Sequence, residues 1–256
     1  MSIKKILFSQ DKPANFEKTP YADLKKNYKV DVDFFKFFSI EGVPLAEFRK
    51  QRINILDYSA IIMTSKNAID QFFRIVEECK IKLPITTKYF CVNSATANYL
   101  QTYTVYRKRK IFFSEDGSPE KLVKEIEQHV ETDKFLVPCC SDTSLNQLLA
   151  LLDTKPAIKY DKAELFKIHF NDLTQVDIYG YDMIVLFSRH GVQSLFNSYP
   201  DFQQKEGMHF AALGEVVVSA AEEAGLTIET YAPQPGITSI FMALEKYLKQ
   251  ENRRRR

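Results

Sequence analysis

The sequence lacks the short motifs that mark several large enzyme classes. It has no G-x-G-x-x-G and no G-x-x-x-x-G-K-[ST] pattern, so neither a dinucleotide site nor a P-loop is predicted. It has no G-x-S-x-G pattern, which excludes a hydrolase nucleophile elbow. Its four cysteines form no C-x-x-C pair and no cluster with histidine at zinc spacing. We therefore expect buried free thiols, no metal and no cofactor; the cysteines are Cys79, Cys91, Cys139 and Cys140.

Long apolar runs and an excess of one charge are also missing. No stretch approaches the ~18 apolar residues of a membrane span, and residues 1–13 predict a first strand instead of a signal peptide. We expect a cytoplasmic protein with no membrane contact. The net charge is +2, and the arginines at 253–256 contribute +4, which leaves the rest near −2. The sequence therefore predicts no nucleic-acid-binding face, and we interpret the arginine run as a solvated end.

Candidate catalytic side chains are few. Of four histidines, only His190 falls in a predicted strand-to-helix loop, where an ordinary surface role is the simpler interpretation. Adjacent carboxylates such as Glu222 and Glu223 fall on one predicted helix and are typical of a solvated face. The pattern argues against metal, nucleophile and hydride chemistry. It leaves binding, or a reaction that depends mainly on holding a reactive substrate in one shape.

One sequence pattern occurs twice. Residues 58–73 (YSAIIMTSKNAIDQFF) and 181–196 (YDMIVLFSRHGVQSLF) each contain an apolar run that stops at a serine, Ser65 or Ser188, before a helical pattern begins. The carboxyl ends of parallel strands gather ligands, and a hydroxyl there can cap a helix and also donate to an anion. Capping alone explains one such junction. The repetition indicates a ligand with several carboxylates.

The order of the predicted elements gives the fold class. Short continuous apolar runs alternate with amphipathic segments, which predicts parallel sheets in an α/β protein. Two extended stretches, residues 29–43 and 163–172, interrupt this rhythm. We predict two parallel-sheet α/β domains joined by a two-stranded β-ladder, with the first strand in the C-terminal set and a ligand cleft between the domains. The predicted boundaries are 1–34 with 172–256 for domain 1, 46–160 for domain 2, and 35–45 with 161–171 for the ladder.

Together these segments resemble the uroporphyrinogen-III synthase family, in the form found in Bacteroidetes-type bacteria. The resemblance covers nearly the whole chain and lies in the order and spacing of its motifs. Besides the repeated unit, these are ILFSQDKP, KYFCVNSATANYL, HFAALGEVVVSAAEEAGL and YAPQPGITSIFMALEKYL.

The resemblance implies a fold, a reaction and a set of partners. The family has two α/β domains on a two-stranded ladder. Its members are cyclising lyases of haem biosynthesis that take hydroxymethylbilane, a linear tetrapyrrole with eight carboxylates. They expel the terminal hydroxyl as water, invert the last ring through a spiro intermediate and close uroporphyrinogen III, without metal or cofactor. We expect a monomer that makes transient contact with the preceding deaminase.

The resemblance also assigns site residues. Phe166 stands at the position of a family tyrosine suited to helping hydroxyl departure, and Tyr160 is a nearby candidate for that role. Gly214 begins a turn in which Val216 and Val217 replace two family threonines. The residues expected to bind substrate are Thr64, Ser65, Ser94, Thr96, Ser188, Arg189, His190, Gly214 and Ser239.

Three functions are compatible with these residues. The first is a uroporphyrinogen-III synthase. The second is a catalytically decayed relative that binds tetrapyrroles or other anions, which the lost hydroxyls motivate. The third is an unrelated two-domain anion-binding protein.

Overall fold

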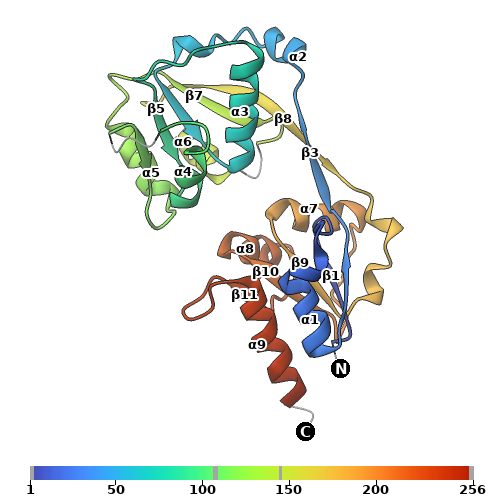
Figure 1. Cartoon of the computed structure of the whole chain (residues 1–256). Coiled ribbons are helices and arrows are strands. Elements are labelled where there is room, and N and C mark those ends of the chain that lie inside the picture. Colours follow the sequence, from blue (N-terminus) through green and yellow to red (C-terminus); the bar gives the residue numbers. More distant parts are fainter. Residues whose placement is uncertain (1–2, 106–108, 144–145, 254–256) are drawn as a thin grey trace. The chain divides into compact units, whose positions relative to one another are not determined.

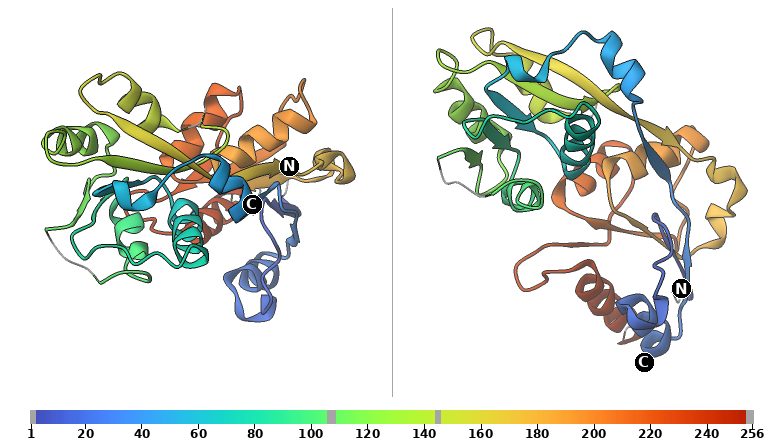
Figure 2. Two further views of the ribbon diagram at one scale, coloured as in Figure 1. Left: turned by 90° about the horizontal axis from the view of Figure 1, so that it is seen from above. Right: turned by 45° about the horizontal axis from the view of Figure 1, so that its top comes forward.

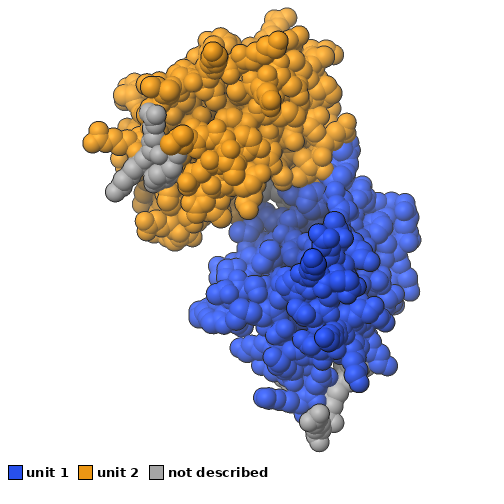
Figure 3. Space-filling model, in the orientation of Figure 1, with its two compact units in different colours: residues 1–39, 169–256 blue, residues 40–168 orange. Residues whose placement is uncertain are grey.

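The computed structural model describes residues 3–105, 109–143 and 146–253 of the chain. Its contacts divide the chain into two compact units, coloured separately in Figure 3. Unit 1 consists of Met1–Ser39 and His169–Arg256, and unit 2 of Ile40–Ile168. The chain thus leaves unit 1, completes unit 2 and returns.

Unit 1 is built on a five-stranded sheet with the order β11-β10-β9-β1-β2, in which every pair is parallel. Its strands are β1 (Lys5–Phe8), β2 (Asp31–Phe34), β9 (Met183–Leu186), β10 (His209–Leu213) and β11 (Thr230–Ala232). The prediction that the first strand joins the C-terminal set is confirmed, because β1 pairs with β9 through Ile6 and Met183.

Helices cover both faces of this sheet (Figure 1). On one face, α7 (Arg189–Ser198) and α8 (Glu215–Glu223) pack on Ile184 and Leu186. On the other face, α1 (Pro20–Tyr28) and α9 (Ile240–Arg253) pack on Met183 and Val185. Successive side chains of a strand point to opposite faces, so a strand buried on both sides is apolar throughout.

Unit 2 carries a six-stranded sheet with the order β3-β8-β7-β4-β5-β6. Its strands are β3 (Phe38–Gly42), β4 (Ala60–Met63), β5 (Lys88–Cys91), β6 (Ile111–Phe113), β7 (Phe135–Cys140) and β8 (Tyr160–Phe170). The strands from β8 to β6 pair in parallel. Only β3 runs against its neighbour: Val43 N donates to Leu165 O at 2.8 Å, and Asn171 N donates to Phe37 O at 2.9 Å.

The layers of unit 2 follow the same rule, and Figure 2 shows its ribbon from two further directions. Ile61 and Met63 face α2 (Leu45–Lys50), α3 (Lys66–Glu78) and α4 (Ser94–Leu100). Ala60 and Ile62 face α5 (Pro119–Glu127) and α6 (Gln147–Asp153). Within the described residues, short 3-10 helices lie at Ile55–Asp57 in unit 2 and at Phe16–Lys18, Leu173–Gln175 and Ile178–Gly180 in unit 1.

The structure confirms the predicted fold class, two parallel-sheet α/β units with a two-stranded antiparallel ladder formed by β3 and β8. The chain changes unit inside these two strands, at 39/40 and 168/169. The apolar runs of the repeated pattern form β4 and β9, as predicted, whereas no apolar run marks β11. Ser118 caps α5 ahead of Pro119.

The thiols differ in part from the sequence-based expectation. All four cysteines are free, but only Cys91 and Cys139 are buried; Cys79 and Cys140 are partly exposed, so the prediction of buried thiols is wrong for two of them. Among the described residues, no helix has the length and apolarity to cross a membrane.

Phe72 provides a test of the unit 2 core. Its side chain on α3 is fully buried against the sheet. We expect Phe72→Ala to lower the free energy of unfolding by about 3–5 kcal/mol, because it removes buried apolar surface and leaves a cavity. Leu56→Ala is the control, since Leu56 is 50% exposed and its truncation should cost well under about 1 kcal/mol. Urea denaturation followed by circular dichroism measures both. Equal losses would contradict the packing of α3.

Candidate functional site

Candidate site residues lie at the carboxyl edge of each sheet, where the strands end and helices begin. In unit 2, β4 and β5 are in register with Met63 opposite Cys91, and Val92 N donates to Met63 O at 3.1 Å. The junction at Thr64 therefore lies beside the junction at Asn93. Thr64 is partly exposed there. Each unit presents such an edge of its own, and each is described by itself.

Two helix starts form the unit 2 edge. Ser65 Oγ caps α3 and accepts from Ala68 N at 3.1 Å, as predicted. The cap of α4 is Asn93, whose side-chain oxygen accepts from Thr96 N at 2.9 Å. Ser94 is instead the first residue of the helix, and it is partly exposed. Asn93 was not among the residues predicted from the sequence, although asparagine is among the strongest N-cap residues.

Thr96 does not serve as an exposed donor. Its side chain is only 4% exposed, and it lies on the buried side of α4 together with Ala97. The structure therefore places Thr96, which was expected to bind substrate, in the core below α4 and apart from the partly exposed hydroxyl residues of this edge. Thr96, Ala97 and Leu100 share one face of α4 by helical spacing, and this face is buried.

The unit 1 edge is built around Ser188. Its Oγ caps α7 and accepts from Gly191 N at 3.1 Å. Ser9 follows β1, the neighbouring strand, and its backbone N donates to Val185 O at 3.1 Å. A Cβ on Gly191 would lie 3.7 Å from both the Ser188 and the Ser9 hydroxyl oxygens, so two serines border the start of α7. Ser9 was missed, because its proximity to Ser188 depends on β1 lying beside β9.

Two basic side chains begin α7. Arg189 and His190 are its first two residues, and both are partly exposed. The His190 ring lies 5.4 Å from the Phe38 ring, tilted by 48°. The guanidinium is a permanent cation with planar donors that match a carboxylate. Its position at a helix N-terminus, where partial positive charge gathers, adds to the attraction for an anion.

The next junction of unit 1 runs from Gly214 to Val217. Gly214 caps α8 with a φ of +94°, and its N donates to Ala232 O at 2.7 Å. No atom lies within 4 Å of a Cβ built there, so the left-handed backbone, not crowding, favours glycine. Val216 is 51% exposed, whereas Val217 is 5% exposed and packs in the core below α8. The valine pair therefore presents one apolar side chain at the edge and buries the other.

Ser239 lies in the loop between β11 and α9. Its Oγ accepts from Met242 N at 3.3 Å, and its carbonyl accepts from Ala243 N at 3.1 Å. It therefore starts α9 in the manner that Ser65 and Ser188 start their helices. Within the described part of the chain, none of these three hydroxyls donates a hydrogen bond. Because a hydroxyl that accepts as a cap retains its proton, each can still donate to a carboxylate.

The two aromatic candidates occupy other places. Tyr160 pairs with Phe135 at the first residue of β8, which is the amino edge of the sheet, and its hydroxyl donates to Asp153 Oδ1. Burial, followed by this hydrogen bond, raises the pKa of Tyr160. The structure therefore places Tyr160, the candidate for assisting hydroxyl departure, at the edge of the sheet opposite to Thr64 and Ser65. Phe166 pairs with Cys140 at the carboxyl end of β7, but its ring is only 6% exposed and belongs to the apolar core.

Comparison with known proteins places these features in context. A sequence model described as uroporphyrinogen-III synthase HemD matches residues 30–242. No curated protein matches the sequence. Among solved structures, a mutant uroporphyrinogen III synthase from the extreme thermophile Thermus thermophilus is similar with a TM-score of 0.71 at 13% identity, covering 97% of this chain and 99% of that one. The corresponding protein of Helicobacter pylori 26695 gives 0.59 at 16% identity, covering 97% and 100%.

The corrected cap of α4 can be tested with a matched pair of variants. We expect Asn93→Ala to lower the free energy of unfolding by about 1 kcal/mol, because it leaves an amide of the first turn without its acceptor. Ser94→Ala should change it by less than about 0.5 kcal/mol, since Ser94 is the first helical residue and partly exposed. Denaturant titrations of both variants measure the difference. A larger loss for Ser94→Ala would show that Ser94, not Asn93, caps α4.

Proposed function

The chain belongs to the uroporphyrinogen-III synthase family, and on that premise we propose how it cyclises hydroxymethylbilane to uroporphyrinogen III. The observation that supports this function is the family match over residues 30–242, which includes the candidate edges of both units. In this reaction the terminal hydroxyl leaves as water, the last pyrrole ring inverts through a spiro intermediate, and the macrocycle closes.

The protein's main task in such a reaction is to hold a flexible polyanion in one shape. Loss of the hydroxyl creates the electrophile on the substrate itself, so no protein nucleophile is required. Aligning the reacting ends of a flexible chain removes much of the entropic barrier to closure. We propose that the substrate carboxylates supply the anchors for this alignment.

Each unit offers donors for those carboxylates. In unit 2 they are Thr64, Ser65 and Ser94, with Asn93 added from the structure; in unit 1 they are Ser188, Arg189, His190 and Ser239, beside the turn that begins at Gly214. The hydroxyls of Ser65 and Ser188 combine a cap with an unused donor. Helix N-termini add backbone amides that have no acceptor within the helix.

The apolar replacements limit how the leaving hydroxyl can be assisted. The side chain at position 166 has no proton to donate, and Val217 fills the unit 1 core. We propose that solvent takes the role of proton donor, because departure is driven mainly by the electron-rich pyrrole. The competing proposal is a decayed relative that binds tetrapyrroles without directing ring inversion. It is favoured by the same replacements.

We also propose that the enzyme acts as a cytoplasmic monomer that receives its substrate through transient contact with the preceding deaminase. Free hydroxymethylbilane closes spontaneously to the non-inverted isomer. A short transfer between the two enzymes therefore favours the inverted product.

A coupled assay decides between synthase and decayed relative. The deaminase supplies hydroxymethylbilane, the products are oxidised, and the type I and type III uroporphyrins are separated. We expect a clear excess of type III over the enzyme-free control. Type I alone, from protein with an intact circular dichroism spectrum, would overturn the proposed synthase activity and support the decayed relative.

Ser188 tests the carboxylate anchors. We expect Ser188→Ala to raise KM by about tenfold or more with a smaller change in kcat, because hydrogen bonds to charged groups contribute roughly 1.5–3 kcal/mol. Ser219→Ala, on the exposed side of α8, is the control and should leave KM unchanged. Ser188→Asn separates capping from binding, since asparagine also caps well. An unchanged KM for Ser188→Ala would remove Ser188 from the site.

A further inference from the structure

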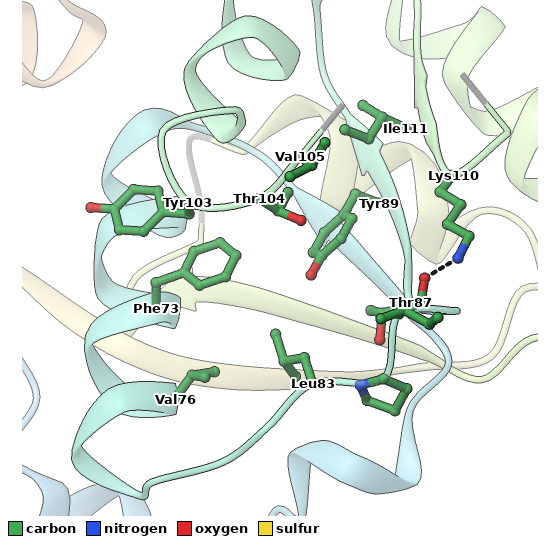
Figure 4. A pocket seen from close by; sticks show the side chains of 12 residues that line it. Phe73, Val76, Leu83, Thr87, Tyr89, Tyr103, Thr104, Val105, Lys110 and Ile111 are labelled. Carbon is green, nitrogen blue, oxygen red and sulfur yellow. Dashed lines mark hydrogen bonds between the residues drawn. The ribbon is translucent and has the colours of Figure 1, made fainter. Parts of the chain in front are cut away.

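Unit 2 contains a pocket that the candidate site does not use. Its volume is about 400 Å³, and it lies between α3, the start of β5 and the start of β6 (Figure 4). Phe73 and Val76 of α3 form one wall, and Leu83 lies beside Val76 on the side toward Thr87. Thr87 and Tyr89, which precede and enter β5, form the opposite wall.

Two hydroxyl groups line this pocket, and within the described residues that of Thr87 is buried without a partner. Thr87 is 4% exposed, and its Oγ1 is buried without a hydrogen bond. Tyr89 is 5% exposed, and Figure 4 shows its hydroxyl pointing into the space between Phe73 and Thr87. Burial raises the pKa of Tyr89 to about 12, so the phenol keeps its proton and can donate. An unsatisfied buried polar group costs free energy, and a ligand that pairs with it recovers that cost.

The remaining surface of the pocket is apolar and suits a flat ring. Phe73 and Tyr103 stack with centroids 4.6 Å apart and planes within 6°. Around the opening, Ile85 is 75% exposed and Val105 is 78% exposed. Exposed apolar side chains that gather around a cavity are typical of a binding site for a small apolar molecule.

The pocket is separate from the proposed substrate edge of unit 2. Thr87 precedes the first residue of β5 and Lys110 precedes the first residue of β6, which places the pocket at the amino ends of these strands. The proposed carboxylate donors lie at the other ends, beyond Met63 and Cys91. Lys110 lines the pocket, and its ammonium already donates to Ile85 O. An octacarboxylate therefore finds few donors in this pocket.

We propose that this pocket binds a one- or two-ring aromatic molecule bearing a hydroxyl group, which pairs with the hydroxyls of Thr87 and Tyr89. A cavity of about 150 Å³ is enough for benzene, so 400 Å³ accommodates two fused rings with a substituent. The rings lie against Phe73 and Leu83. The polar group reaches the Tyr89 hydroxyl directly, and it reaches the Thr87 hydroxyl when this side chain, which no hydrogen bond holds, rotates toward the pocket. This inference does not depend on the synthase activity.

The probe for this site is 2-naphthol, with naphthalene as its counterpart without the hydroxyl. We expect 2-naphthol to raise the melting temperature of the full chain and to shift the amide resonances of Thr87 and Tyr89. Naphthalene should bind about tenfold more weakly, because it leaves both hydroxyls unpaired. No shift of these resonances by 2-naphthol at its solubility limit would overturn the proposal.

Variants test which groups recognise the probe. The Thr87→Val, Tyr89→Phe double variant should weaken 2-naphthol about tenfold and leave naphthalene unchanged. The Thr87→Val change should not lower ligand-free stability, since the Thr87 hydroxyl is buried without a partner in the described chain. Ile85→Asp at the exposed rim should weaken both compounds, whereas Leu56→Asp, also exposed in unit 2, should weaken neither. Unchanged 2-naphthol affinity in the double and rim variants would show that it binds elsewhere.

Discussion

Burial of the central strands on both faces is the constraint from which the rest of this structure follows. In β4, Ile61 packs under α3 and Ile62 packs under α5, and neither has exposed surface. Because helices cover both faces of such a strand, the chain leaves the sheet at the carboxyl end of the strand, and the next helix begins there. The helix starts therefore collect along one edge of each sheet. The polar residues at those starts are needed for capping and become available for ligand binding at the same time.

Much of the fold was predictable because continuous apolar runs report burial on both faces. The apolar run in MIVLFS predicted β9, and the run in AIIMTS predicted β4. The three residues of β11, Thr230–Ala232, carry no such run, since Thr230 and Tyr231 are only partly buried. The candidate site was predictable only where one junction could be interpreted alone, as at Ser65 and Ser188. The position of Ser9 beside Ser188 could be predicted only with the strand order of the sheet. The role of Asn93 required the first turn of α4, and the position of Tyr160 required the register of β8.

The apolar residues at family hydroxyl positions differ in what they contribute here. Val217 and Phe166 lie in the cores of unit 1 and unit 2, with 5% and 6% of their surfaces exposed. Restoring a hydroxyl at either position would place a polar group in an apolar cluster, which is costly unless it finds a partner. Val216 is different, because it is exposed at the start of α8. The loss of a polar group there affects the edge without adding to the core.

The discontinuous course of unit 1 sets an order on its assembly. Lys5 N donates to the carboxylate of Asp182, 177 residues further along the chain, and β1 pairs with β9 just beyond. All of unit 2, residues 40–168, is synthesised before β9. Unit 2 can therefore complete its sheet while β1 still has no partner on that side, and unit 1 closes last. Pairing across so long a separation in sequence is slow, because a large loop must be ordered first. During synthesis, the sequence of unit 2 is thus complete at a stage when the second segment of unit 1 has not yet been made.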